Sequence, residues 1–146
     1  MPSFAKSATQ YTTFEKRYDA DGGVWVQVQA HGNLTALTPY KVIVNEFGYL
    51  TAAIADDTTR YYVGVPQAAV ASGAVAWIQI GGYVAGVVTP SLSGGVGEAL
   101  SITNGVITDD AADYTGVSNQ FAVFAVASTS STTQSVILIP EMAIGT

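Results

Sequence analysis

The sequence predicts a single-domain, all-β protein, built as a β-barrel or β-sandwich of about eight to ten short strands with an extended N-terminal arm. Three observations favour this fold class. Apolar residues make up 49% of the 146-residue chain and charged residues only 11%, which is typical of a folded protein. Short apolar runs recur along the chain, and Gly, Pro, Asn or Asp separates them. Each run is far shorter than the ~20 residues that cross a bilayer as a helix, so we expect no membrane span.

We predict that residues 1–21 form the extended arm and that residues 22–146 form the β-barrel or β-sandwich body. The arm is polar with scattered aromatic residues, and it holds three of the five basic residues of the chain. A short amphipathic helix is the alternative. Threonines are poor helix formers and no apolar stripe of helical period persists here, so we favour the extended form.

The strands of the body follow in order. At residues 24–29, Val24, Val26 and Val28 alternate with Trp25 and two glutamines, which predicts a strand with one buried face. Further strands are predicted at residues 40–44, 50–55, 61–65, 75–80, 83–89, 99–102, 121–127 and 135–139.

Several connections have specific chemistry. Asn104-Gly105 predicts a two-residue hairpin, and Gly81-Gly82 predicts a tight reversal. A short helix is predicted around residues 66–72, because proline favours its start and glycine follows its end. Residues 109–113 and the Ser/Thr tract at 128–134 predict exposed, mobile loops.

Charge and composition exclude several functions. The net charge of −6 and a pI near 4.3 argue against nucleic acid as a partner, since phosphate binding needs a basic surface. With no cysteine and a single histidine, thiol catalysis and a multi-histidine zinc site are excluded. The N-terminus lacks the apolar core of a secretion signal, so we expect synthesis in a cytoplasm.

The polar residues that could do chemistry fit structural roles better. His31 precedes Gly-Asn and is interpreted as a turn or strand-end residue, and Glu98 as the entrance of a strand. Asp19-Ala20-Asp21-Gly22-Gly23 resembles the opening of a calcium loop, but the glutamate that closes such a loop is replaced by Ala30. An irregular cation loop at Asp109, Asp110 and Asp113 stays open as an alternative. We therefore predict a protein that is not an enzyme and has no catalytic residue, cofactor or metal.

Aromatic residues offer a further alternative. Some of the fifteen could form a stacking platform for sugars, whereas aromatic residues on strands more often fill a core or a subunit interface. The candidates for such a platform are Trp25, Tyr40, Tyr49, Tyr61, Tyr62 and Tyr83.

Residues 62–84 carry a resemblance to a known family. Here an Ala-rich stretch ends in Ala71-Ser72-Gly73, and a strand with Trp77-Ile78-Gln79-Ile80, a glycine and another apolar strand follow. With Gly97-Glu98-Ala99-Leu100 and the late apolar strands, this pattern resembles the small head-decoration, or cement, proteins of tailed bacteriophages. The resemblance covers roughly the C-terminal two thirds of the chain.

The resemblance implies a structural protein of the virion exterior, made in the cytoplasm of a bacterial host. It implies a homotrimer that bridges major capsid protein subunits and stabilises an expanded icosahedral capsid, without an active site. A tail or spike component and a carbohydrate-binding surface module remain alternatives.

The same picture suits the charge distribution, because no Lys, Arg or His follows Arg60 and oligomer interface cores are depleted in charge. We expect the capsid contacts in the arm, at Phe4, Lys6, Tyr11, Phe14, Lys16 and Arg17. We expect the trimer interface to include Tyr62, Trp77, Tyr83 and Val87.

Overall fold

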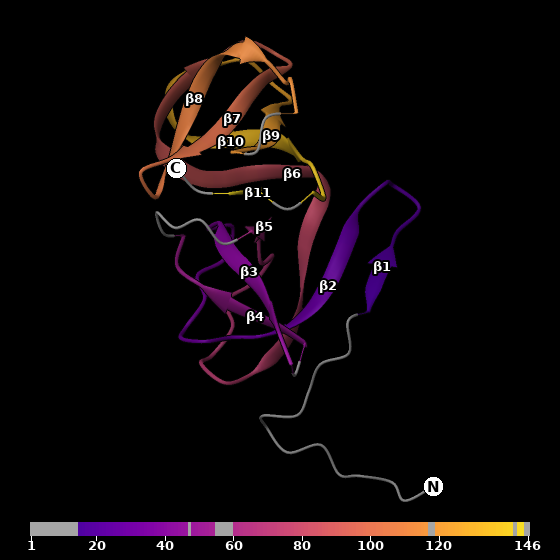
Figure 1. Cartoon of the computed structure of the whole chain (residues 1–146). Coiled ribbons are helices and arrows are strands. Elements are labelled where there is room, and N and C mark those ends of the chain that lie inside the picture. Colours follow the sequence, from indigo (N-terminus) through magenta and orange to yellow (C-terminus); the bar gives the residue numbers. More distant parts are fainter. Residues whose placement is uncertain (1–14, 47, 55–59, 117–118, 142, 145–146) are drawn as a thin grey trace, which may run out of the picture.

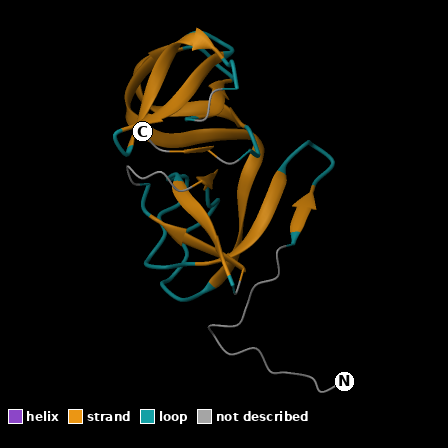
Figure 2. Cartoon of the chain, in the orientation of Figure 1, coloured by secondary structure: helices purple, strands orange, loops and turns teal. Residues whose placement is uncertain are grey.

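The computed structural model of the chain describes residues 15–46, 48–54, 60–116, 119–141 and 143–144. The described residues form eleven strands and no helix, which confirms the all-β prediction (Figure 2). The strands are β1 (Lys16–Tyr18), β2 (Val24–Gln29), β3 (Tyr40–Asn45), β4 (Gly48–Ala52), β5 (Arg60–Gly64), β6 (Val75–Gly94), β7 (Glu98–Thr103), β8 (Val106–Asp113), β9 (Gln120–Phe124), β10 (Ser128–Leu138) and β11 (Ala143–Ile144).

All strands belong to one sheet, in the order β11-β5-β3-β4-β2-β6-β10-β9-β7-β8, with β1 added beside β2. In the described part of the chain the two ends of this path, β11 and β8, do not pair with each other, so the sheet is not closed into a barrel. Neighbours are antiparallel except β2 and β4, which pair in parallel. No helix among the described residues is long and apolar enough to cross a membrane.

Strand β6 organises the molecule. Its first part, Val75 to Gly81, pairs with β2, and its second part, Gly82 to Gly94, pairs with β10. Figure 1 shows β6 passing from one lobe into the other. We call β1–β4 with residues 75–81 the lower lobe, and residues 82–94 with β7–β10 the upper lobe.

The predicted reversal at Gly81-Gly82 is therefore wrong. The chain bends here and remains one strand. At Gly82, φ is +88°, and a Cβ would lie 2.8 Å from the carbonyl oxygen of Gly22. Gly82 is therefore needed for a bend and for the close approach of the Gly22 backbone. Both require a residue without a Cβ that accepts a positive φ, as a hairpin turn also does.

Each lobe has its own apolar core. In the lower lobe, Val24, Val26 and Val28 pack with residues of β3, β4 and β6, so the predicted alternation of this strand is confirmed. The upper core is larger and centres on Leu100, Ile102 and Phe124. Strand β5 connects the two, because it pairs with β3 while Tyr61 and Val63 pack into the upper core.

Two local predictions have clear outcomes. The Asn104-Gly105 hairpin is confirmed, since both residues have positive φ and Thr103 pairs with Val106. The helix at residues 66–72 is wrong: Val70 exchanges backbone hydrogen bonds of 2.8 and 3.0 Å with Leu34, and this pairing takes the groups that a helical turn would use.

Residues 109–113 and 128–134 were predicted as loops, and this is also wrong. They belong to β8 and β10, respectively. Residues 128–134 have mostly polar, outward-facing side chains, and their partner β6 supplies the pairing. The polar residues of this segment therefore belong to a strand with one solvent-exposed face.

Candidate functional site

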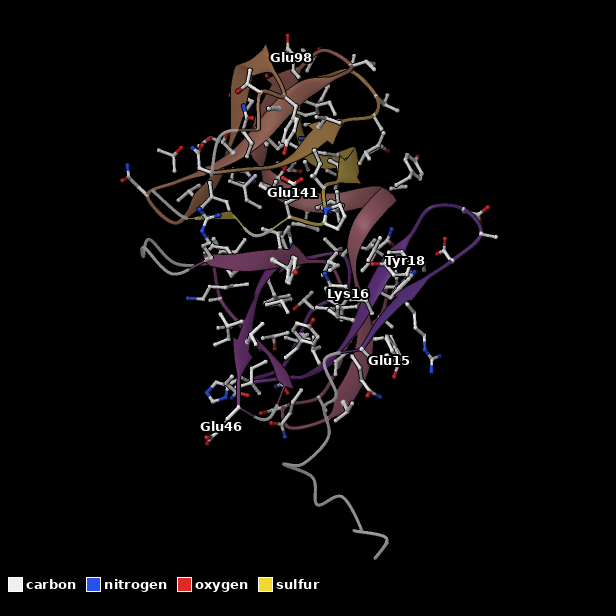
Figure 3. The ribbon with its side chains drawn as sticks, turned by 45° about the vertical axis from the view of Figure 1, so that its right-hand side comes forward. Glu15, Lys16, Tyr18, Glu46, Glu98 and Glu141 are labelled. Carbon is white, nitrogen blue, oxygen red and sulfur yellow. The ribbon has the colours of Figure 1, made fainter. Side chains whose placement is uncertain are left out.

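The last residues of the predicted arm lie on the body as strand β1. Lys16 Nζ donates a hydrogen bond of 2.9 Å to Tyr62 Oη, and the Arg17 guanidinium lies 4.2 Å from the centre of the Trp77 ring. The hydrogen bond to Tyr62 raises the pKa of Lys16 above its ordinary value of 10.5, against the effect of partial burial. Figure 3 labels Lys16 and Tyr18 on β1 and Glu15 directly before it.

Two predicted capsid contacts thus meet two predicted interface residues within one chain. The other four arm residues, Phe4, Lys6, Tyr11 and Phe14, lie outside the described residues. Backbone pairing with β2, together with these contacts to β5 and β6, fixes β1 on the body.

Val87 and Tyr83 differ in what they can contact. Tyr83 is 56% exposed, whereas Val87 is 2% exposed and packs in the upper core, so Val87 is not accessible to another chain. Plain alternation along β6 would place both on the same face. However, Val84 pairs with Val136 and Val87 with Gln134, so β6 contains one extra residue there. This bulge, at Ala85-Gly86, reverses the alternation and turns Val87 inward.

The outer face of the β6–β10 pair carries exposed apolar side chains without charge. Tyr83 lies opposite Ile137, and Val88 lies opposite Thr133. Strands β6 and β10 contain no charged residue. We call the exposed residues Tyr83, Ala85, Val88 and Ile137 the β6–β10 strip.

A hollow of about 380 Å³ lies where the β1–β2 turn meets the bend of β6. It is lined by Asp19, Asp21, Gly23, Trp25, Gln67, Gln79 and Tyr83. The lining combines two carboxylates, two amides and two aromatic rings. We refer to it as the Asp19–Tyr83 hollow.

Asp19 is held by three hydrogen bonds. Its Oδ1 accepts the backbone N–H of Asp21 at 3.0 Å and of Gly23 at 2.7 Å, and its Oδ2 accepts the indole N–H of Trp25 at 2.9 Å. These three hydrogen bonds hold the pKa of Asp19 below its ordinary value of 3.8, and the bond from the indole of Trp25 has the largest effect. The Asp-x-Asp-Gly-Gly pattern therefore builds a turn, which explains its resemblance to a calcium loop.

Gln79 holds the opposite wall. It is buried, and its Nε2 donates to the carbonyl oxygens of Gly81 at 2.8 Å and Tyr83 at 3.1 Å. Its Oε1 accepts a hydrogen bond of 3.2 Å from Gln67 Nε2. Sequence reasoning missed both glutamines, because only the folded chain brings residues 19–25, 67 and 79 together.

The other polar candidates have structural partners or lie apart. Glu98 begins β7 as predicted, and its carboxylate accepts the Gly95 N–H at 2.9 Å. Asp109 accepts the Ser93 N–H at 2.8 Å, and the side chains of Asp110 and Asp113 lie outside those described. His31 is exposed just after β2. Within the described ranges, no group of three or more His, Asp and Glu side chains could hold a metal ion.

Comparison with known proteins gives one result at the level of fold. No protein-family model and no curated protein matches the sequence. Among solved structures, the chain is similar to the N base of head fiber gp8.5 of bacteriophage phi29, with a TM-score of 0.51 and 14% sequence identity. The match covers 82% of this chain and 96% of that chain. The two proteins therefore share an all-β fold over most of their lengths.

Proposed function

We propose that this chain is a structural protein of a tailed-phage virion, which lies on the exterior of the head and binds the major capsid protein as a homotrimer. The fold shared with a phage head fiber base carries the proposal. Fold alone is an analogy, since one fold can host many functions. The resemblance of residues 62–84 to head-decoration proteins is a second, sequence-level observation that favours the same place in the particle.

Self-association is assigned to the β6–β10 strip. An exposed surface of Tyr, Val, Ile and Ala without charge resembles the core of a subunit interface, where charged residues are depleted. A second copy of the chain is a suitable occupant, because a closed ring of three subunits buries the same surface on every subunit.

Attachment to the capsid is assigned to residues 1–14, which precede β1 in the sequence. Three such segments on one trimer would bind together, so that modest contacts give firm attachment by multivalency. The bridging of neighbouring capsid subunits would stabilise the shell. This role is mechanical and needs no catalytic group.

Quantitative mass spectrometry of purified virions tests the proposal. A protease that cuts at acidic residues is required, because trypsin has no site after Arg60. A copy number comparable with that of the major capsid protein is expected. A copy number far below this would move the protein to the tail or a spike and overturn the head role. Absence from the particles would overturn a virion role altogether.

A further inference from the structure

We propose that the Asp19–Tyr83 hollow binds a neutral saccharide. The inference rests on the geometry of the hollow and is independent of the virion role. At about 380 Å³ the hollow falls at the small end of the range for small-molecule sites.

The two aromatic rings supply apolar contact. Trp25 is half-buried on β2, and Tyr83 is 56% exposed just after the bend of β6. One side of a pyranose ring presents C–H groups, which pack on aromatic faces, while the tyrosine hydroxyl keeps a polar tip in water. Rings on two different strands define a site with two walls.

The polar groups suit hydroxyl ligands. Carboxylates accept hydrogen bonds from sugar hydroxyls, and amides both donate and accept them. Asp21 and Gln67 are exposed at the hollow, and Gln67 is oriented by its bond to Gln79. Asp19 is fixed by its three donors and Gln79 by its two acceptors, so little side-chain freedom remains to be lost on binding.

The charge of the lining selects the ligand class. Of the seven lining residues, two are carboxylates and none is Lys, Arg or His. A phosphate, sulfate or sugar acid would meet like charge without a compensating cation in the lining. A neutral sugar meets no such cost.

Two glycines keep the hollow open. A Cβ on Gly23 would lie 2.9 Å from Trp25 Nε1 and would press on the Asp19 carboxylate. A Cβ on Gly82 would strike the backbone of Gly22 and displace the turn. The walls of this hollow thus depend on residues that contribute no side chain.

The test is a titration of the full chain with maltotriose, cellotriose and chitotriose, with 3′-sialyllactose as the anionic comparison. Tryptophan fluorescence and saturation-transfer NMR report binding. We expect at least one neutral trisaccharide to bind with a Kd of about 1 mM or tighter. Sialyllactose is expected to bind at least tenfold more weakly.

Variants locate the site. Tyr83→Ala and Asp21→Ala should each weaken binding at least tenfold, while the control Tyr18→Ala, which removes a 73% exposed tyrosine outside the lining, should leave the affinity unchanged. No neutral trisaccharide bound at about 10 mM, or full affinity in both hollow variants, would overturn the proposal.

Tyr83 also belongs to the β6–β10 strip, so the titration is repeated with Val88→Lys, which changes the strip without touching the lining. We expect equal affinity. Binding seen only in this variant would mean that self-association covers the hollow, and the proposal would fail for the assembled protein. In contrast, a loss of self-association with unchanged sugar affinity keeps the two proposals separate.

Discussion

Asp19 is the residue on which the β1–β2 turn depends, because one carboxylate accepts two backbone N–H groups and an indole N–H. Trp25 is the largest of the causes that lower its pKa below 3.8. We therefore predict that Trp25→Phe raises the pKa of Asp19 toward its ordinary value. Carbon-13 NMR titration of the carboxyl group measures this. Trp77→Phe is the matched control and should not change the pKa; an unchanged pKa in Trp25→Phe would contradict the prediction.

The same carboxylate has a consequence for stability. A group whose folded pKa is depressed stabilises the fold above its unfolded pKa, and this contribution is lost as the pH falls through the folded pKa. The wild-type protein should therefore be more stable than Asp19→Asn at neutral pH. The difference should shrink below pH 3.8 and vanish below the folded pKa. Thermal unfolding of both proteins across this range provides the measurement, and a difference that grows toward acid would reverse the sign.

Single residues also show how far sequence reasoning reaches. Local chemistry was sufficient for Asn104-Gly105 and for Glu98, because a two-residue turn and a strand entrance depend on immediate neighbours. It failed at Val87, since the bulge that turns this side chain inward is set by pairing with β10. No local pattern marks Gln67 or Gln79 as part of a site, and only the tertiary fold places them beside the Asp19 turn.

At the scale of elements, Gly82 and Gly97 separate two reasons for a glycine: a positive φ and a close backbone approach. Gly82 and Gly97 have nearly the same φ, +88° and +87°, but only Gly82 faces backbone where a Cβ would lie. Gly97→Ala should cost about 1 kcal/mol from positive φ alone, and Gly82→Ala about 3 kcal/mol or more, since the Gly22 carbonyl must also shift. Urea unfolding checks both values, and equal costs would show that the close approach has no energetic role.

Elements also explain which parts of the fold were mispredicted. Periodicity finds short runs such as residues 24–29, where one face is buried over the whole length. The same reasoning wrongly divides β6 at Gly81-Gly82, because a pair of glycines is found both at a bend within a strand and at a reversal between two strands. Residues 128–134 show the other failure: a polar tract reads as a loop until a partner strand supplies hydrogen bonds to its backbone.

At the scale of the whole molecule, the proposed trimer depends on the β6–β10 strip. Val88→Lys should abolish the trimer, because it places an unpaired charge in an apolar interface, while the monomer stays folded. Val44→Lys is the matched control, since Val44 is 47% exposed against 45% for Val88 and lies on β3 in the other lobe. Analytical ultracentrifugation gives the masses. A trimer that survives Val88→Lys, or a wild-type monomer under all conditions, would refute the assignment.

The continuity of β6 determines how the molecule would carry a mechanical load. Twenty residues at about 3.3 Å each give a contour of about 66 Å that passes through both lobes. A pull that separates the lobes acts along this backbone and must shear its hydrogen bonds with β2 on one side and β10 on the other, where many bonds resist together. A short linker between two independent domains would transmit no such resistance. We therefore expect β6 to transmit a pulling force between the lobes, and we expect the two lobes to unfold together.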